Sequence, residues 1–104
     1  MRDNDNIGVM FDPAHPGEVL AAAYLEPLAM SVRTLAAALG VSHSALSRVV
    51  AGQASLTSDM AVRLEKVLGR SAESWLRLQE QYDLHQSRLT LDLSHLHRLD
   101  LLSA

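Results

Sequence analysis

One stretch of the chain combines residue types that could recognise a nucleic acid by hydrogen bonding. Between Gly40 and Gly52, apolar residues recur at helical spacing and define one buried face, formed by Leu46, Val49 and Val50. The opposite face and its N-terminal cap carry donors and acceptors but no carboxylate: Ser42, His43, Ser44, Ser47 and Arg48. In a DNA major groove, arginine can bond guanine bidentately and a small hydroxyl can bond either base. The pattern therefore favours DNA recognition, with Arg48 as the main discriminating residue.

The elements around this stretch predict a helix-turn-helix. The preceding helix is expected over residues 32–39, with Ser31 as its N-cap. Its apolar stripe comprises Val32, Leu35, Ala36 and Leu39. Gly40 can take the positive φ of a tight turn, and Ala36, four residues earlier, is small enough for two helices to cross closely. Val41 is expected to fill the gap between them. Ser42 then caps the second helix, which ends at Gly52.

Three further helices are expected, which makes the predicted fold all-α. The first begins near His15–Glu18 and stops at Glu26–Pro27. Its apolar face would hold Val19, Leu20, Ala23, Tyr24 and Leu25. The fourth helix is capped by Thr57, buries Met60, Leu64, Val67 and Leu68, and exposes Arg63, Lys66 and Arg70 near its C-terminal end. The fifth is capped by Ser71, presents Trp75, Leu76, Leu78 and Tyr82, and ends near His85 or Gln86.

Length and composition limit the classes of protein to consider. The chain has 104 residues, which suits one domain, and 48% of them are hydrophobic, enough to fold. It has no cysteine, which excludes disulfides and thiolate zinc sites. No apolar run is long enough to span a membrane, and the N-terminus lacks the apolar core of a signal peptide, so the cytoplasm is the expected location.

Charge is distributed unevenly along the chain. The formal net charge is −3, yet residues 31–70 carry five basic and two acidic residues, a net of +3. The segments before and after are net acidic. The basic segment coincides with the predicted helix-turn-helix, which supports nucleic-acid binding more than the total charge opposes it.

The two ends of the chain are expected to differ from the central domain. We expect residues 1–14 to form a flexible N-terminal segment, residues 15–86 the helix-turn-helix domain, and residues 87–104 a leucine-rich extension. Alternating leucines favour a short strand at 88–93 followed by a helical turn or two, although a helical stripe also fits. The extension either covers a partner subunit, forming a dimer, or packs on its own domain.

Catalytic and metal sites are not indicated. His85, His95 and His97 are candidate metal ligands, but a structural zinc site needs four ligands and the sequence does not supply them. The helical spacing of Trp75 and Tyr82 indicates core residues rather than a ligand platform. No nucleophile, base and orienting group come together, and no phosphate-binding glycine loop is present. We therefore expect neither enzymatic activity nor a cofactor.

Several of these motifs resemble a known family. Ser42 to Gly52, followed by Leu56-Thr57 and Met60–Leu64, is similar to the XRE-type helix-turn-helix of lambdoid phage repressors. A longer set resembles the HigA antitoxins: His15-Pro16-Gly17-Glu18, Tyr24–Leu28, Leu46-Ser47-Arg48 with Gly52, and Trp75–Leu84. The resemblance covers about residues 15–86. It implies a five-helix, lambda-repressor-like domain and a homodimer.

The resemblance also implies a function and a set of contacts. HigA antitoxins repress transcription of their own operon by binding a palindromic operator, and they neutralise a HigB ribonuclease toxin. Carried over by position, His43, Ser44 and Arg48 read bases, with Ser42 and Ser47 beside them. Gln53 stands where family members often have a basic residue that contacts a phosphate. Ala51 stands where they often have a residue with an amide group. Arg33 or the amides that begin its helix would then hold the phosphate.

Two other functions fit the same residues. A stand-alone phage- or plasmid-type repressor would bind an operator and have no toxin partner. A protein-interaction module would use the last helix and the leucine-rich extension, and would keep the helix-turn-helix only for packing. Loss of operator affinity on replacing Arg48 with alanine would separate both DNA-binding hypotheses from this module.

Overall fold

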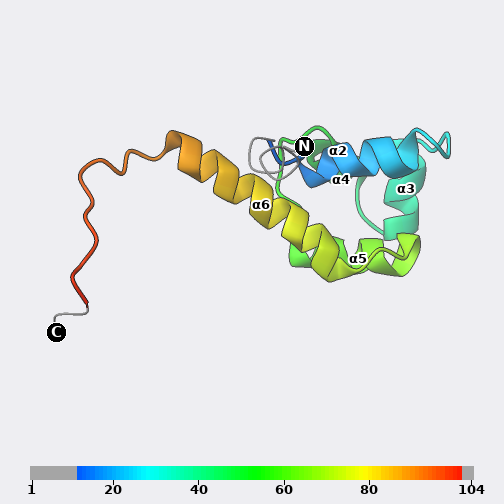
Figure 1. The fold of residues 1–104 in the computed structure, drawn as a ribbon. Helices are drawn as coiled ribbons and strands as arrows, with labels where there is room; N and C mark the ends of the chain where they lie inside the picture. Colours follow the sequence, from blue (N-terminus) through cyan, green and yellow to red (C-terminus); the bar gives the residue numbers. More distant parts are fainter. Residues whose placement is uncertain (1–11, 102–104) are drawn as a thin grey trace, which may run out of the picture.

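The computed structural model describes residues 12–101, so most of the predicted N-terminal segment lies outside the described residues. The first helix joins an α-helical part, α2 (Pro16–Leu20), to a π-helical part, η1 (Ala21–Leu25). It is followed by α3 (Val32–Leu39), α4 (His43–Val50), α5 (Ser58–Leu68) and α6 (Ala72–Thr90). Across residues 12–101, the prediction of an all-α fold of five helices is confirmed (Figure 1).

The helix starts follow the predicted caps. The hydroxyls of Ser31, Ser42, Thr57 and Ser71 each accept a hydrogen bond from an amide of the following first turn. These bonds satisfy donors that have no partner within the helix. At α2 the cap is His15, whose Nδ1 accepts from the Gly17 amide at 2.9 Å, and Pro16 takes the first helical position.

The hydrophobic core lies among α2, α3, α4, α5 and the first half of α6 (Figure 1). Its buried members are Leu20, Leu25, Leu35, Ala36, Leu39, Leu46, Val49, Leu56, Met60, Ala61, Leu64, Ala72 and Trp75. Most of these residues were expected from helical spacing. The core therefore fixes α3 and α4 against the other helices, which sets the orientation of the helix-turn-helix.

Two predicted core residues are exposed. Ala23 is exposed because η1 is π-helical: the amide of Glu26 bonds the carbonyl of Ala21, five residues back, and this wider turn brings Leu25 to the core instead. In α5, Val67 is 40% exposed, whereas Ala61 is fully buried. The core-facing side of α5 therefore includes this small residue, which permits close helix packing.

The C-terminal prediction of a strand at 88–93 is wrong. Helix α6 continues through Thr90, with the Leu91 amide bonding the Ser87 carbonyl at 2.9 Å. Residues 91–101, here called the arm, follow without strand structure, because no other segment of the described chain lies beside them to complete a ladder. The one backbone turn in the arm bonds Leu96 N to Leu93 O at 2.9 Å.

The arm and the end of α6 extend far from the core (Figure 1). The Cα radius of gyration is 17.6 Å, compared with about 13 Å for a compact chain of this length. The arm therefore does not pack on its own domain, which was one of the two arrangements expected for it. Among residues 12–101, no helix has the length and apolar character needed to cross a membrane.

Candidate nucleic-acid interface

The turn between α3 and α4 is held by contacts from both of its sides. Gly40 has φ +73°, and the amides of Gly40 and Val41 bond the carbonyls of Ala37 and Ala36. From α5, Arg63 donates Nη1 to the Leu39 carbonyl at 2.7 Å. Arg63 was expected to lie exposed near the C-terminal end of its own helix, α5. It instead caps the C-terminal end of α3, which packs against α5. The turn angle that presents α4 is therefore fixed by a tertiary contact.

Helix α4 has one buried and one exposed face, as predicted. Leu46 is fully buried and Val49 is 4% exposed, so both anchor the helix in the core. His43, Ser44 and Arg48 are exposed, and Ser47 is half-buried. The hydroxyl oxygen of Ser42 accepts from the Ala45 amide at 3.0 Å, and its proton stays available for donation.

Arg48 contributes a charged group to this exposed face that no carboxylate among residues 12–101 neutralises. In the part of the chain that the structure describes, it forms no ion pair. A guanidinium in this state can approach guanine or phosphate without first breaking a salt bridge. Within the described residues, Arg48 is therefore not a surface arginine that a carboxylate holds in a salt bridge.

Arg33 and Gln53, the two other candidates, lie outside α4. Arg33 is exposed in the first turn of α3, just after the Ser31 cap. Gln53 is exposed in the loop after α4. Its backbone N–H donates to the Arg48 carbonyl at 2.8 Å. The Ala54 amide bonds the same carbonyl at 3.2 Å. The loop that carries Gln53 is therefore tied to the end of α4, and all seven predicted residues belong to the helix-turn-helix or the loop that follows it.

A close contact between α2 and α4 was not predicted. A Cβ placed on Gly17 would lie 2.1 Å from the Val49 carbonyl oxygen and 2.6 Å from that of Val50. These are backbone atoms and cannot move aside as a side chain could. Glycine at position 17 thus allows the first turn of α2 to sit directly on the C-terminal end of α4.

His15 and Tyr82 link the two ends of the sequence pattern that resembles HigA. The His15 ring is 4% exposed and meets the Tyr82 ring edge-on, with centroids 5.0 Å apart and planes at 83°. This contact packs α6 against the start of α2. The signal in the sequence was the His15-Pro16-Gly17 motif itself, but its contact with Tyr82 depends on the fold.

Gln79 is a second buried polar residue that sequence reasoning left without a role. It is 7% exposed, and its Oε1 accepts from the Leu56 amide at 2.7 Å while Nε2 donates to Asp83 at 2.9 Å. It therefore ties the loop after α4 to α6. A glutamine four residues after Trp75, on the apolar side of a helix, was the available signal.

Of the two aromatic residues of α6 predicted as core residues, Trp75 belongs to the hydrophobic core, whereas Tyr82 is half-buried and lies outside it. Trp75 is fully buried and its ring lies 5.9 Å from that of Tyr24. The guanidinium of Arg70 stacks over the Trp75 ring at 4.9 Å from its centroid, a cation–π contact. Arg70 was expected to be exposed, but it is half-buried because this ring covers it.

The histidines considered for a metal site are spread apart. His85 lies 2.9 Å from an Asp12 carboxylate oxygen, whereas His95 and His97 lie on the arm. Within residues 12–101, no three His, Cys, Asp or Glu side chains gather in a way that could hold a metal ion.

The fold and the exposed face of α4 define a class: a helix-turn-helix protein whose second helix presents polar and basic side chains outward. The chain belongs to the XRE-type helix-turn-helix family, whose model (HTH_3, helix-turn-helix) matches residues 22–75. The family consists of DNA-binding regulators and antitoxins rather than enzymes.

Relatives of known sequence support this placement. Virulence-associated protein I of Dichelobacter nodosus is 46% identical over 70 residues, which cover 67% of this chain and 65% of that protein. Antitoxin HigA-1 of Vibrio cholerae is 36% identical over 76 residues, which cover 73% of this chain and 71% of that protein. The resemblance to HigA antitoxins is therefore confirmed in sequence.

Solved structures agree with the sequence relatives. The antitoxin GraA superposes with a TM-score of 0.81 at 30% identity, covering 86% of this chain and 99% of that one. The Pseudomonas aeruginosa antitoxin HigA, solved with the higBA promoter, gives a TM-score of 0.78 at 33% identity, covering 86% and 98%. The chain thus has the fold of HigA-like antitoxins over nearly their full length.

Proposed function

We propose that this protein represses its own operon by binding a palindromic operator and acts as the antitoxin of a HigB-like ribonuclease toxin. The observation that carries the proposal is the exposed face of α4, with Arg48 unpaired in the described chain and no carboxylate beside it. A neighbour of the same fold was solved with its promoter, which supports the DNA-binding part.

In this proposal some of the seven candidate residues contact bases and the others contact the DNA backbone. Arg48, His43 and Ser44 contact base edges from α4, with Ser42 and Ser47 beside them. Arg33 and the first amides of α3 hold the phosphate backbone, and Gln53 makes an uncharged backbone contact. A homodimer would place two copies of α4 about one turn of DNA, roughly 34–36 Å, apart, which requires a palindromic site.

A titration against DNA tests the repressor part. The full-length protein is titrated with a fragment from immediately upstream of its own gene and with random DNA, at about 50 and about 200 mM salt. We expect tighter binding to the upstream fragment and weaker binding at higher salt, because phosphate contacts release counterions. Equal or absent binding to both fragments would overturn the repressor proposal.

A separate experiment tests the antitoxin part. A HigB-like ribonuclease encoded beside the gene is expressed with and without this protein, and growth and complex formation are measured. We expect growth to recover and the two proteins to co-purify. Operator binding without either effect would leave the stand-alone repressor as the correct function.

A further inference from the structure

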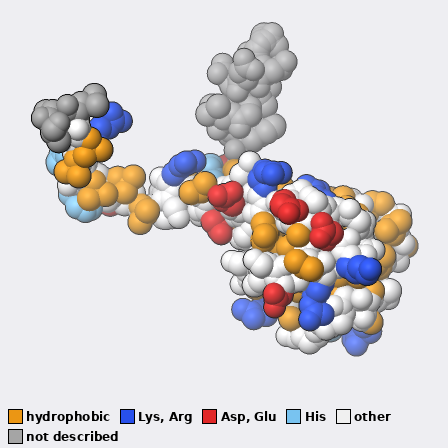
Figure 2. All heavy atoms as spheres, turned by 90° about the horizontal axis from the view of Figure 1, so that it is seen from below, with side chains coloured by type: hydrophobic (Ala, Val, Ile, Leu, Met, Phe, Trp, Pro, Cys, Tyr) orange, Lys and Arg blue, Asp and Glu red, His pale blue; other side chains and the backbone are white. Residues whose placement is uncertain are grey.

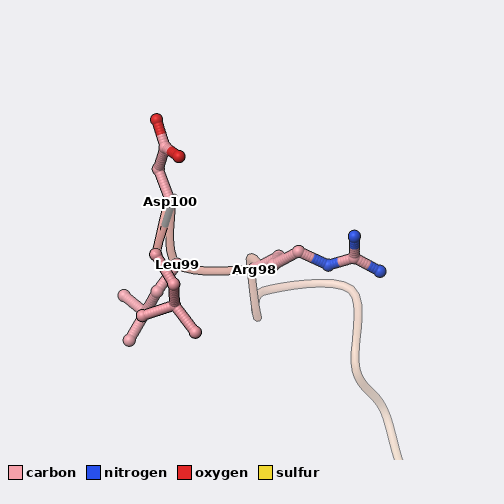
Figure 3. A pocket seen from close by; sticks show the side chains of 4 residues that line it. Arg98, Leu99 and Asp100 are labelled. Carbon is pink, nitrogen blue, oxygen red and sulfur yellow. The ribbon is translucent and has the colours of Figure 1, made fainter. Parts of the chain in front are cut away.

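Charge alone does not explain how this protein would present α4 to DNA. Figure 2 shows Lys and Arg side chains spread over one face of the body rather than gathered in a single patch. On the arm, the side chain of Arg98 projects in a different direction from those of Leu99 and Asp100 (Figure 3). Charges distributed in this way attract DNA without reading its sequence. A residue that determines sequence preference must instead act on the bases themselves or on the position of the helix that reads them.

Arg63 acts on the turn that precedes α4. Its Nη1 donates to the Leu39 carbonyl at 2.7 Å and, more weakly, to the Gly40 carbonyl at 3.4 Å. The same nitrogen would lie 3.1 Å from a Cβ at Gly40, so the guanidinium rests directly against the turn. Backbone amides of the turn already satisfy two earlier carbonyls of α3. Arg63 thus supplies a donor to the last carbonyls of this helix, where the helix dipole also favours a cation.

The two ends of α4 are held in different ways. At the C-terminal end, Val49 is buried in the core, and the carbonyls of Val49 and Val50 lie directly against Gly17. At the N-terminal end, residues 42–45 are exposed, and the half-buried Val41 packs against the core just before them. Apolar packing has no preferred direction, whereas hydrogen bonds do. The bonds from α5 to the turn are therefore the contacts best able to set the angle of this end.

A small tilt of α4 would affect its two ends unequally. If the helix stays in place at Val49, Ser44 lies five residues away, or about 7.5 Å along the helix axis. A tilt of about 10° would then move the Ser44 backbone by about 1.3 Å, but that of Arg48 by only about 0.3 Å. A good hydrogen bond tolerates a range of about 0.5 Å in the distance from donor to acceptor. Contacts from the N-terminal end of α4 to DNA bases therefore depend on what holds the turn.

We propose that Arg63 is a positioning residue for operator recognition, which holds the N-terminal end of α4 at the angle where His43 and Ser44 reach the bases. This inference rests on the DNA binding of the proposed function, and it gives a role in that function to a residue on α5, outside the helix-turn-helix. Arg63 acts through the turn and needs no contact with DNA. Its loss should lower the preference for the operator over random DNA, because attraction to phosphates carries no sequence information.

Three variants of the full-length protein test this role. Arg63→Met keeps an aliphatic side chain and removes the donors, whereas Arg63→Lys keeps the charge and one donor group. Lys66→Met, the control, removes one charge from an exposed position of the same helix. Each protein is titrated with the upstream fragment and with random DNA, at a temperature where circular dichroism shows all of them folded. We expect Arg63→Met to lower the ratio of the two affinities roughly tenfold, Arg63→Lys to restore most of it, and Lys66→Met to leave it unchanged.

A double-mutant cycle separates positioning from a general loss of stability. The paired change His43→Ala with Ser44→Ala, and separately Arg48→Ala, are each made in the wild type and in Arg63→Met. The paired change should weaken operator binding less in Arg63→Met, because the contacts it removes are already lost there. Arg48→Ala should weaken binding by the same factor in both backgrounds, since a tilt hardly moves its backbone. A general loss of stability would not distinguish the two ends of α4 in this way.

The possible results differ in what they contradict. An unchanged affinity ratio in Arg63→Met would overturn the role of Arg63 and leave the proposed operator binding intact. Additive effects throughout the cycle, or no effect of the paired change at His43 and Ser44 in the wild type, would also overturn it, because Arg63 would then not act through that end of α4. A wild-type protein that binds both fragments equally would overturn this inference together with the repressor proposal.

Discussion

At the scale of single residues, we expect the proposed recognition face of α4 to depend most on Arg48. Its guanidinium is exposed and forms no ion pair in the described part of the chain. Arg48→Ala should weaken operator binding by about 1–3 kcal/mol, or roughly 5- to 150-fold, if the guanidinium bonds a guanine bidentately. The loss should be smaller on random DNA. The affinities of the wild-type protein and of Arg48→Ala are compared by titration against the upstream fragment and random DNA. Arg77→Ala serves as the control for the loss of one charge. Unchanged operator affinity would contradict the role of α4.

Residue-level properties were also the ones that sequence reasoning predicted best. The caps Ser31, Ser42, Thr57 and Ser71 were identified correctly because capping depends on local chemistry within one turn. The buried and exposed faces of α4 followed from helical period. By contrast, the partners of Arg63 and Arg70 were missed, because each lies on a neighbouring surface that local spacing does not specify.

At the scale of elements, the fit between α2 and α4 predicts a cost for any side chain at position 17. Glycine-to-alanine changes within a helix usually stabilise it, by up to about 1 kcal/mol. At Gly17 the sign should reverse, because the added Cβ would clash with two backbone carbonyls of α4. We expect Gly17→Ala to lower the free energy of unfolding by about 2–3 kcal/mol, measured by urea denaturation.

The control for this prediction is Gly69→Ala. A Cβ at Gly69 meets nothing within 4 Å, but the backbone there has φ +92°, so the substitution isolates the conformational penalty of about 1 kcal/mol. Equal destabilisation by the two substitutions would show that α2 can shift away from α4 at little cost.

The contact between α6 and the loop after α4 makes a second prediction at this scale. Gln79→Ala removes the acceptor of the Leu56 amide, which is then buried without a partner. The free energy of unfolding should fall by about 1–3 kcal/mol. Gln81→Ala, at an exposed position of the same helix, should change it by less than about 0.5 kcal/mol. Similar losses in both variants would indicate a helix-propensity effect instead.

Element boundaries show where periodicity ceases to be informative. The helical period used for the first helix does not apply through η1, and this is why Ala23 was placed in the core. Helix α6 passes its expected end near Gln86 because Ser87 to Thr90 contain no glycine or proline to stop it. The alternating leucines misled the interpretation, since alternation alone does not produce a strand without a neighbouring strand.

At the scale of the whole molecule, we propose that the domain of residues 15–86 and the extension of 87–104 make separate contributions. A chain ending at Thr90 should still unfold cooperatively, because the leucines of the arm are exposed and outside the core. Its melting temperature should not depend on protein concentration, whereas that of the full chain should rise with concentration if the arm joins two copies. Calorimetry over a range of concentrations makes this comparison. Loss of cooperative unfolding in the shortened chain would contradict the division.

The separation of the two faces of α4 has a consequence for how this family diversifies. The residues that anchor the helix, Leu46 and Val49, are different from those that face outward, His43, Ser44 and Arg48. Mutations on the outward face therefore need not be accompanied by compensating changes in the interior. Duplicated copies in one genome could acquire distinct operators in few mutational steps, each through a folded intermediate, and so escape cross-regulation.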